Sequence, residues 1–97
     1  MIKYILEGKQ VKQVDDLLKW AKWFNKANRT VDKTRIAHVL ISTVFLGIDR
    51  SLGVGTPLLF ETMIFGGNYD GYHDRYATWG EAMKGHQSAC EKVAALN

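Results

Sequence analysis

The segment of residues 47–57, Gly-Ile-Asp-Arg-Ser-Leu-Gly-Val-Gly-Thr-Pro, combines residue types that could bind an anion. Glycines allow backbone N–H groups to converge on a negative charge, and an arginine with nearby hydroxyls can add donors. No Gly-Lys-Ser/Thr sequence and no expected helix follow, which argues against a P-loop or a dinucleotide fingerprint. The alternative is a long hairpin connection with glycines at its turns. The predicted ligand-binding residues of this loop are Asp49, Arg50, Ser51, Gly53, Gly55 and Thr56.

A second candidate binding segment is the turn-rich, aromatic stretch of residues 66–77. Tyrosines beside an arginine suit recognition because they offer large, rigid area with polar tips. From this stretch we predict Tyr72, Arg75 and Tyr76 as ligand-binding residues. The alternative is a surface loop whose tyrosines cover the end of a sheet.

Glu61 is the one carboxylate on an otherwise apolar strand face, beside Leu59, Met63 and Phe65. A carboxylate in such a place must be paired, solvated at an open face or functional. We therefore include Glu61 among the predicted ligand-binding residues.

Metal binding and catalysis have little support in the sequence. His86 and Cys90, at i and i+4, could place two metal ligands on one helix face, but a stable zinc site needs three or four. Both residues also lie on an apolar stripe, where a hydrogen-bonded histidine and a buried thiol are ordinary. No spacing of carboxylates and histidines selects an acid–base pair. We therefore predict no metal, no cofactor and no catalytic residue, and we favour a protein without enzymatic activity.

The charge distribution is uneven along the 97 residues, which we expect to form a single domain, 1–97. Residues 1–50 carry a net charge of +5 and residues 51–97 a net charge of −2, giving +3 for the chain. A basic half can meet nucleic acid, a phosphorylated ligand or an acidic protein face. The alternative is a solvated basic helix face, and no groove-reading motif supports nucleic acid.

Composition predicts a cytoplasmic protein that does not enter a membrane. The single cysteine, Cys90, allows no internal disulfide, as in a reducing compartment. The longest apolar run, around residues 39–48, is interrupted by polar residues and glycine and is too short to span a bilayer. The first residues are charged too early for a signal peptide.

The expected elements are a hairpin over residues 3–14, a helix capped by Asp15 or Asp16 and running to about Asn28, strands over 36–46 and 58–65, and a last helix that begins with a capping box from Thr78 to Glu81. We interpret residues 29–35 as a polar connection. This order, ββαββα, predicts an α+β fold with an antiparallel sheet of about four strands, built from two hairpins, and both helices on one face. The central strands are apolar on both faces, so we expect a helix layer on one side and a subunit partner on the other. A homo-oligomer is therefore expected.

Several stretches resemble a group of small proteins encoded in bacteriophages, prophages and other mobile elements. The resemblance covers most of the chain. It is carried by residues 16–24, 42–49, 57–63 and 65–66, by Thr78-Trp79, and by Glu81-Ala82 with Gly85-His86. It implies that the gene lies in a phage or another mobile element, and it implies no particular chemistry. Relatives often have histidine where this chain has Arg50.

The resemblance and the candidate residues together suggest a non-enzymatic accessory protein in the cytoplasm of a bacterial host. Small phage-encoded proteins often bind a host enzyme or sequester a host nucleotide signal. We expect a small anionic, nucleotide-like ligand, with sequestration of a host signal as the possible role. The alternative is a protein-binding inhibitor of a host enzyme or a structural accessory protein.

Overall fold

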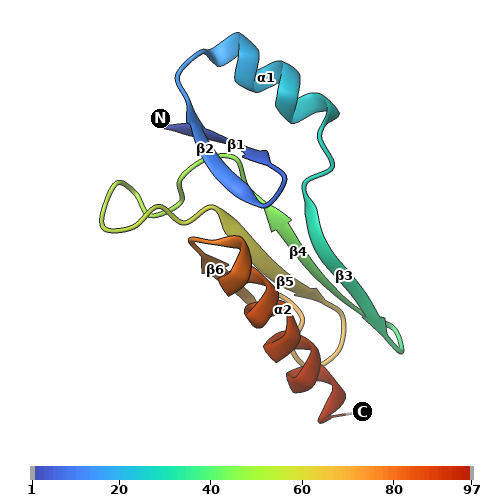
Figure 1. Ribbon diagram of the computed structural model, residues 1–97. Helices are drawn as coiled ribbons and strands as arrows, with labels where there is room; N and C mark the ends of the chain where they lie inside the picture. The colour runs from blue at the N-terminus through green and yellow to red at the C-terminus, as the bar shows by residue number, and fades with distance from the viewer. Residues whose placement is uncertain (1, 97) are drawn as a thin grey trace.

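The structure, a computed structural model that describes residues 2–96, contains two antiparallel sheets and two helices (Figure 1). The elements are β1 (Lys3–Glu7), β2 (Gln10–Val14), α1 (Leu17–Lys26), β3 (Thr30–Ile36), β4 (Val39–Phe45), β5 (Phe60–Phe65), β6 (His73–Tyr76) and α2 (Trp79–Ala94). β1 and β2 form a two-stranded sheet, and β3-β4-β5-β6 form a four-stranded one. The α+β class is confirmed. The ββαββα order is wrong, because two further strands, β3 and β6, flank the predicted central pair and the first hairpin stays separate.

β3 lies where the sequence predicted a polar connection. It pairs with β4 from Thr30↔Val44 to Ile36↔Val39, and a two-residue turn joins the strands. The turn has no glycine or asparagine, although Ala37 adopts a φ of 53°, in the left-handed region that glycine usually fills. β3 also carries three charged side chains, Asp32, Lys33 and Arg35, as edge strands often do. Both features hide a hairpin from reasoning on sequence patterns.

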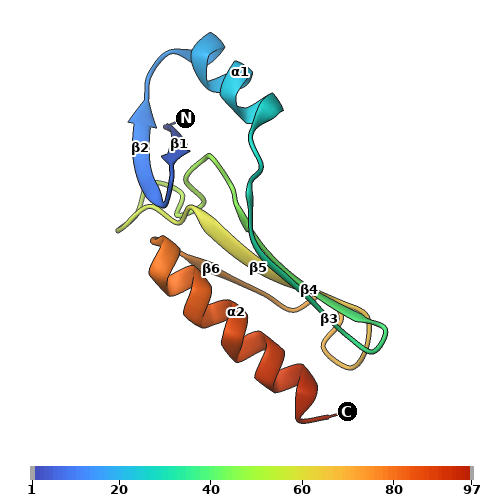
Figure 2. The ribbon, with the colours of Figure 1, turned by 45° about the vertical axis from the view of Figure 1, so that its right-hand side comes forward.

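The inner face of the four-stranded sheet lies beneath α2 (Figure 2). Side chains along β4 and β5 alternate between buried and partly exposed, as the predicted strand periodicity requires. The buried set on this face is Val39, Ile41, Thr43, Phe45, Phe60, Thr62 and Ile64. It meets the buried stripe of α2, formed by Ala82, His86, Ala89 and Val93. The predicted helix layer is thus present on this side.

The first hairpin and α1 are attached near the start of the β4–β5 connection. The backbone N–H of Tyr4 donates to the carbonyl of Gly47 (2.8 Å), and the indole N–H of Trp20 lies 3.0 and 3.2 Å from the carbonyls of Tyr4 and Gly47. Trp23 packs edge-on against Phe45, with ring centroids 5.8 Å apart. α1 therefore packs mainly on β1 and β2 rather than beside α2 on the four-stranded sheet, unlike the predicted arrangement.

Both helix starts match the sequence signals. The Asp16 carboxylate accepts hydrogen bonds from the N–H groups of Leu18 and Lys19. Thr78 and Glu81 form the predicted capping box. Neither helix within residues 2–96 has the length and apolar content needed to cross a bilayer.

Candidate functional site

The glycine-containing loop after β4 is organised around Asp49. Its carboxylate accepts from the Ser51 N–H (2.8 Å), the Ser51 hydroxyl (2.8 Å) and the Leu58 N–H (2.9 Å). The Arg50 N–H donates to the Leu58 carbonyl at 3.0 Å and closes the neck of the loop. Of the donors predicted for an external anion, those of Ser51 are thus bonded to a carboxylate of the same chain.

These hydrogen bonds favour the ionised form of Asp49. The Ser51 N–H contributes most to lowering its pKa below the ordinary 3.8, followed by the Ser51 hydroxyl and the Leu58 N–H, and burial opposes them. Beyond this clamp, Gly53, Gly55 and Thr56 are exposed at the loop tip, and Arg50 is exposed at its neck.

Glu61 is paired with Arg75 across neighbouring strands. The two residues are opposite one another in the β5–β6 register, and the Arg75 Nε donates to a Glu61 oxygen at 2.8 Å. The side chains are 15% (Glu61) and 38% (Arg75) exposed. The carboxylate of Glu61 is therefore neutralised by Arg75, which was predicted separately as a ligand-binding residue.

The two predicted tyrosines belong to the α2 side of the sheet instead. Tyr76 lies opposite Phe60, on the face beneath α2, and its ring crosses the helix at Gly85, where an added Cβ would lie 2.1 Å from the Tyr76 hydroxyl oxygen. Tyr72 packs against the core, with the Lys92 amine 4.1 Å from its ring centroid. Burial raises the pKa of Tyr76 above its ordinary 10.0. Both tyrosines pack in the fold, so they do not share a surface with Arg75.

A buried polar network that the sequence reasoning did not assemble joins α2 to the sheet. The His86 imidazole is 3% exposed; its Nδ1 lies 2.7 Å from the Thr43 hydroxyl and its Nε2 lies 2.8 Å from the Thr34 hydroxyl. Thr43 is hydrogen-bonded in turn to Thr62. A carboxylate oxygen of Asp32 lies 3.7 Å from Nε2. Three threonines on adjacent inward positions of neighbouring strands were the available sequence signal.

This network satisfies the buried polar groups and offers no access to a substrate. Thr43 and Thr62 are fully buried, and within residues 2–96 every buried side-chain nitrogen and oxygen has a hydrogen-bond partner. Burial lowers the pKa of His86 below 6.5, with Asp32 opposing the shift. No group of three His, Cys, Asp or Glu side chains in the described chain could hold a metal ion. An Asp–His–Thr arrangement therefore serves packing here.

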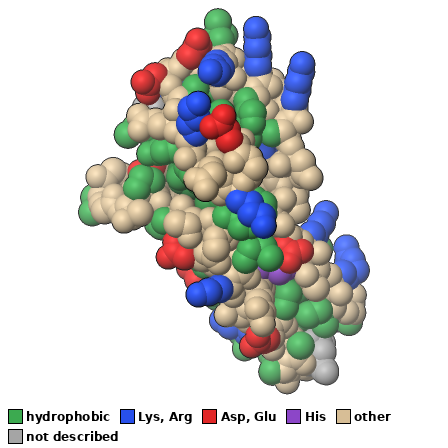
Figure 3. Space-filling model, in the orientation of Figure 1, with side chains coloured by type: hydrophobic (Ala, Val, Ile, Leu, Met, Phe, Trp, Pro, Cys, Tyr) green, Lys and Arg blue, Asp and Glu red, His purple; other side chains and the backbone are tan. Residues whose placement is uncertain are grey.

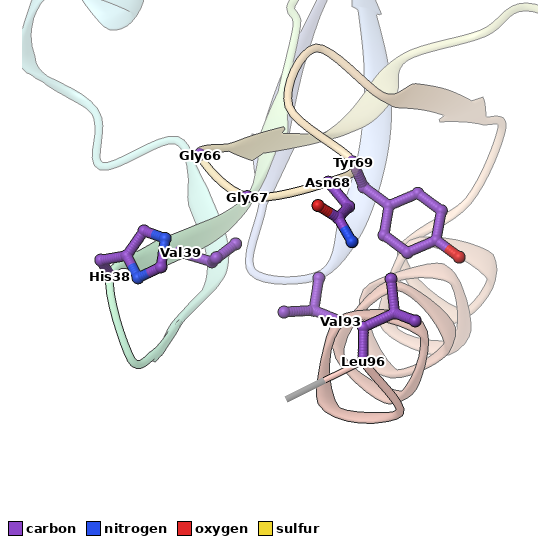
Figure 4. Close-up of a pocket in the computed structure, with 8 residues that line it drawn as sticks. All are labelled: His38, Val39, Gly66, Gly67, Asn68, Tyr69, Val93 and Leu96. Carbon is purple, nitrogen blue, oxygen red and sulfur yellow. The ribbon is translucent and has the colours of Figure 1, made fainter.

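Neither of two hollows offers an enclosed nucleotide site, because one is too small and the other is open to solvent. One, of about 180 Å³, lies between the β3–β4 turn, the loop after β5 and the end of α2, where His38, Asn68 and Tyr69 border apolar side chains (Figure 4). The other, of about 380 Å³, lies between Lys9 and the first turn of α2 and is open to solvent. Ligand pockets commonly enclose about 300–1,000 Å³ and bury most of their ligand. Neither hollow includes a predicted ligand-binding residue.

The outer face of the four-stranded sheet is the remaining candidate, and we call it the open face. Figures 1 and 2 place α2 on one side of this sheet and no helix on the other. The register places four apolar side chains in its centre, with Ser42 between the two on β4: Leu40, Val44, Met63 and Phe65. The flanking strands add Lys33, Arg35, His73 and Arg75. On the α2 side, by contrast, acidic and basic side chains are interspersed (Figure 3).

No family model, no curated protein and no solved structure matches this chain. The phage resemblance and the functional expectations drawn from it therefore stay predictions. Within the described residues, the open face combines exposed or partly exposed apolar side chains with the exposed basic side chains of Lys33 and Arg35.

Proposed function

We propose that this chain is a non-catalytic binding protein that recognises a protein partner through the open face of its four-stranded sheet. The observation that carries the proposal is that two central strands turn a row of apolar side chains away from α2, the helix that covers the inner face of the sheet. Phe65 is 46% exposed, while Leu40, Val44 and Met63 are partly exposed. An exposed apolar centre with a polar rim is typical of a protein interface.

Of the two functions expected from the sequence, we therefore favour a protein-binding accessory factor over a nucleotide-binding one. The Ser51 donors and the Leu58 N–H are taken by Asp49, and the Arg75 Nε is taken by Glu61. Tyr72 and Tyr76 pack on the side of α2 and are unavailable as a stacking surface beside Arg75. A free nucleotide would thus find few of the groups predicted to hold it.

Two variants with matched exposure test the binding face. Phe65→Glu places a charge on the open face, and Met83→Glu, at a residue 40% exposed on α2, is the control. Immobilised wild type and Met83→Glu should retain the same stoichiometric partner from a bacterial lysate, and Phe65→Glu should lose it. Equal retention by all three proteins would refute the proposed face.

The nucleotide alternative has a separate outcome. If nucleoside phosphates raise the unfolding temperature of the wild type, and Arg50→Ala and Arg75→Ala both abolish the shift, the anionic-ligand function replaces the one proposed. Under our proposal, no nucleoside phosphate shifts the unfolding temperature.

A further inference from the structure

We infer that the partner segment seated on the open face is an amphipathic α-helix with acidic side chains along one flank. This inference rests on the proposed function and specifies the chemistry of its partner. The first observation that supports a helix is the size of the open face. Four strands about 4.8 Å apart give a face about 14 Å wide, and an α-helix with its side chains is about 10–12 Å across.

The length of the apolar row agrees with a helix as well. Leu40 and Val44 are four residues apart on β4, and Phe65 lies beside Leu40 while Glu61 lies beside Val44. Four residues of strand extend about 14 Å, which nearly three turns of helix would cover. α2 already covers the inner face in this way with its stripe of buried residues. A second helix would add a layer over the face of the sheet that α2 leaves open.

The basic side chains beside the apolar row indicate which charge the bound helix would carry. The β3 flank places Lys33 beside Ser42 and Arg35 beside Leu40, and both basic residues are exposed. The β6 flank is balanced, because Arg75 is paired with Glu61. Carboxylates on one side of the incoming helix would therefore lie along β3, above Lys33 and Arg35.

Two other occupants fit the open face less well. A second copy of the chain would bring Lys33 and Arg35 against a face whose one acidic residue, Glu61, is already paired. Single-stranded nucleic acid gains much of its binding from stacking on aromatic side chains, and the open face offers one aromatic ring from Phe65 and the imidazole of His73. The aliphatic centre suits leucine-type side chains better.

The test uses synthetic helices of about sixteen residues. One peptide carries leucines at i, i+3, i+4 and i+7 with glutamates along one flank, and its match carries lysine in place of each glutamate. Titrated into the whole protein, the glutamate peptide should shift the backbone amide resonances of Leu40, Val44, Met63 and Phe65. The lysine peptide should bind at least about tenfold more weakly.

The charge-reversed protein makes the test decisive. Lys33→Glu with Arg35→Glu should invert the preference, so that the lysine peptide binds and the glutamate peptide does not, while Met83→Glu should leave the wild-type preference unchanged. Both reversed residues are exposed, and thermal unfolding checks that the variant folds.

Three results would overturn the inference. They are no binding of the glutamate peptide, equal binding to the charge-reversed protein, or shifts confined to the lysines of α1. If oligothymidylate alone shifts the open face, the acidic helix is wrong, a nucleic-acid partner is indicated and the face remains a binding site. Failure of the proposed function itself is read separately, from partner capture that Phe65→Glu does not change.

Discussion

Replacing Gly85 by alanine should destabilise the protein, although alanine is the better helix former. A Cβ at Gly85 would lie 2.1 Å from Cζ and 2.4 Å from Cε1 of Tyr76, closer than side chains tolerate. Overpacking of a core typically costs about 1–3 kcal/mol, and the gain in helix propensity offsets at most about 1 kcal/mol. We expect a net loss of about 1–2 kcal/mol in the free energy of unfolding. For a chain of this size that lowers the unfolding temperature by roughly 5–15 °C.

Gly80 supplies the control within the same helix. A Cβ there meets no atom within 4 Å, so Gly80→Ala should raise the stability by about 0.5 kcal/mol. Urea and thermal unfolding of both variants give the comparison. In a Tyr76→Leu background the ring is gone, and Gly85→Ala should no longer be destabilising. Similar stability for Gly85→Ala and Gly80→Ala, or an unchanged cost without the ring, would refute the proposed contact between α2 and β6.

Three further predictions concern the polar groups. The folded-state pKa of His86 is depressed, so the unfolded chain binds its proton more readily. The contribution of His86 to the free energy of unfolding should therefore be fully present above pH 6.5. It should fall as the pH drops below 6.5 towards the folded-state pKa, with a slope of at most about 1.4 kcal/mol per pH unit. Urea unfolding at several pH values measures this slope, and His86→Gln should remove it; an unchanged slope would contradict the argument. Asp49→Ala should release the loop neck, seen as faster hydrogen exchange at the Ser51 and Leu58 amides, whereas Asp16→Ala should leave those two amides protected. Glu61→Gln should cost less than about 1 kcal/mol in urea unfolding, because Arg75 is 38% exposed and water screens the pair; a much larger loss would mean that the pair is a core contact.

Local patterns in the sequence predicted much of the secondary structure. The capping residues Asp16 and Thr78 mark both helix starts, and the alternation in β4 and β5 assigns the correct faces to Thr43 and Phe60. These features depend on neighbours within a few residues, which a sequence displays directly. β3 was not predicted, because its turn holds Ala37 in a left-handed conformation for which the sequence carries no signal.

The candidate residues show the limit of the same reasoning. Asp49 and Ser51 were both predicted to contact an external ligand, yet in the fold the carboxylate of Asp49 accepts both donors of Ser51. The sequence showed a glycine loop with charges, and only the folded loop shows which charge the N–H groups face. Such an outcome depends on the path of the backbone between β4 and β5.

By itself, the sequence determined the α+β class, the helix caps, the apolar strands and the excess of basic residues in the first fifty positions. The tertiary structure alone decided that Glu61 meets Arg75, that His86 meets two threonines, and that Tyr76 crosses α2 at Gly85. It also decided that one sheet face is left without a helix. Periodicity and capping act along the chain, whereas these meetings depend on strand register and on the packing of layers, in which residues far apart in sequence become neighbours.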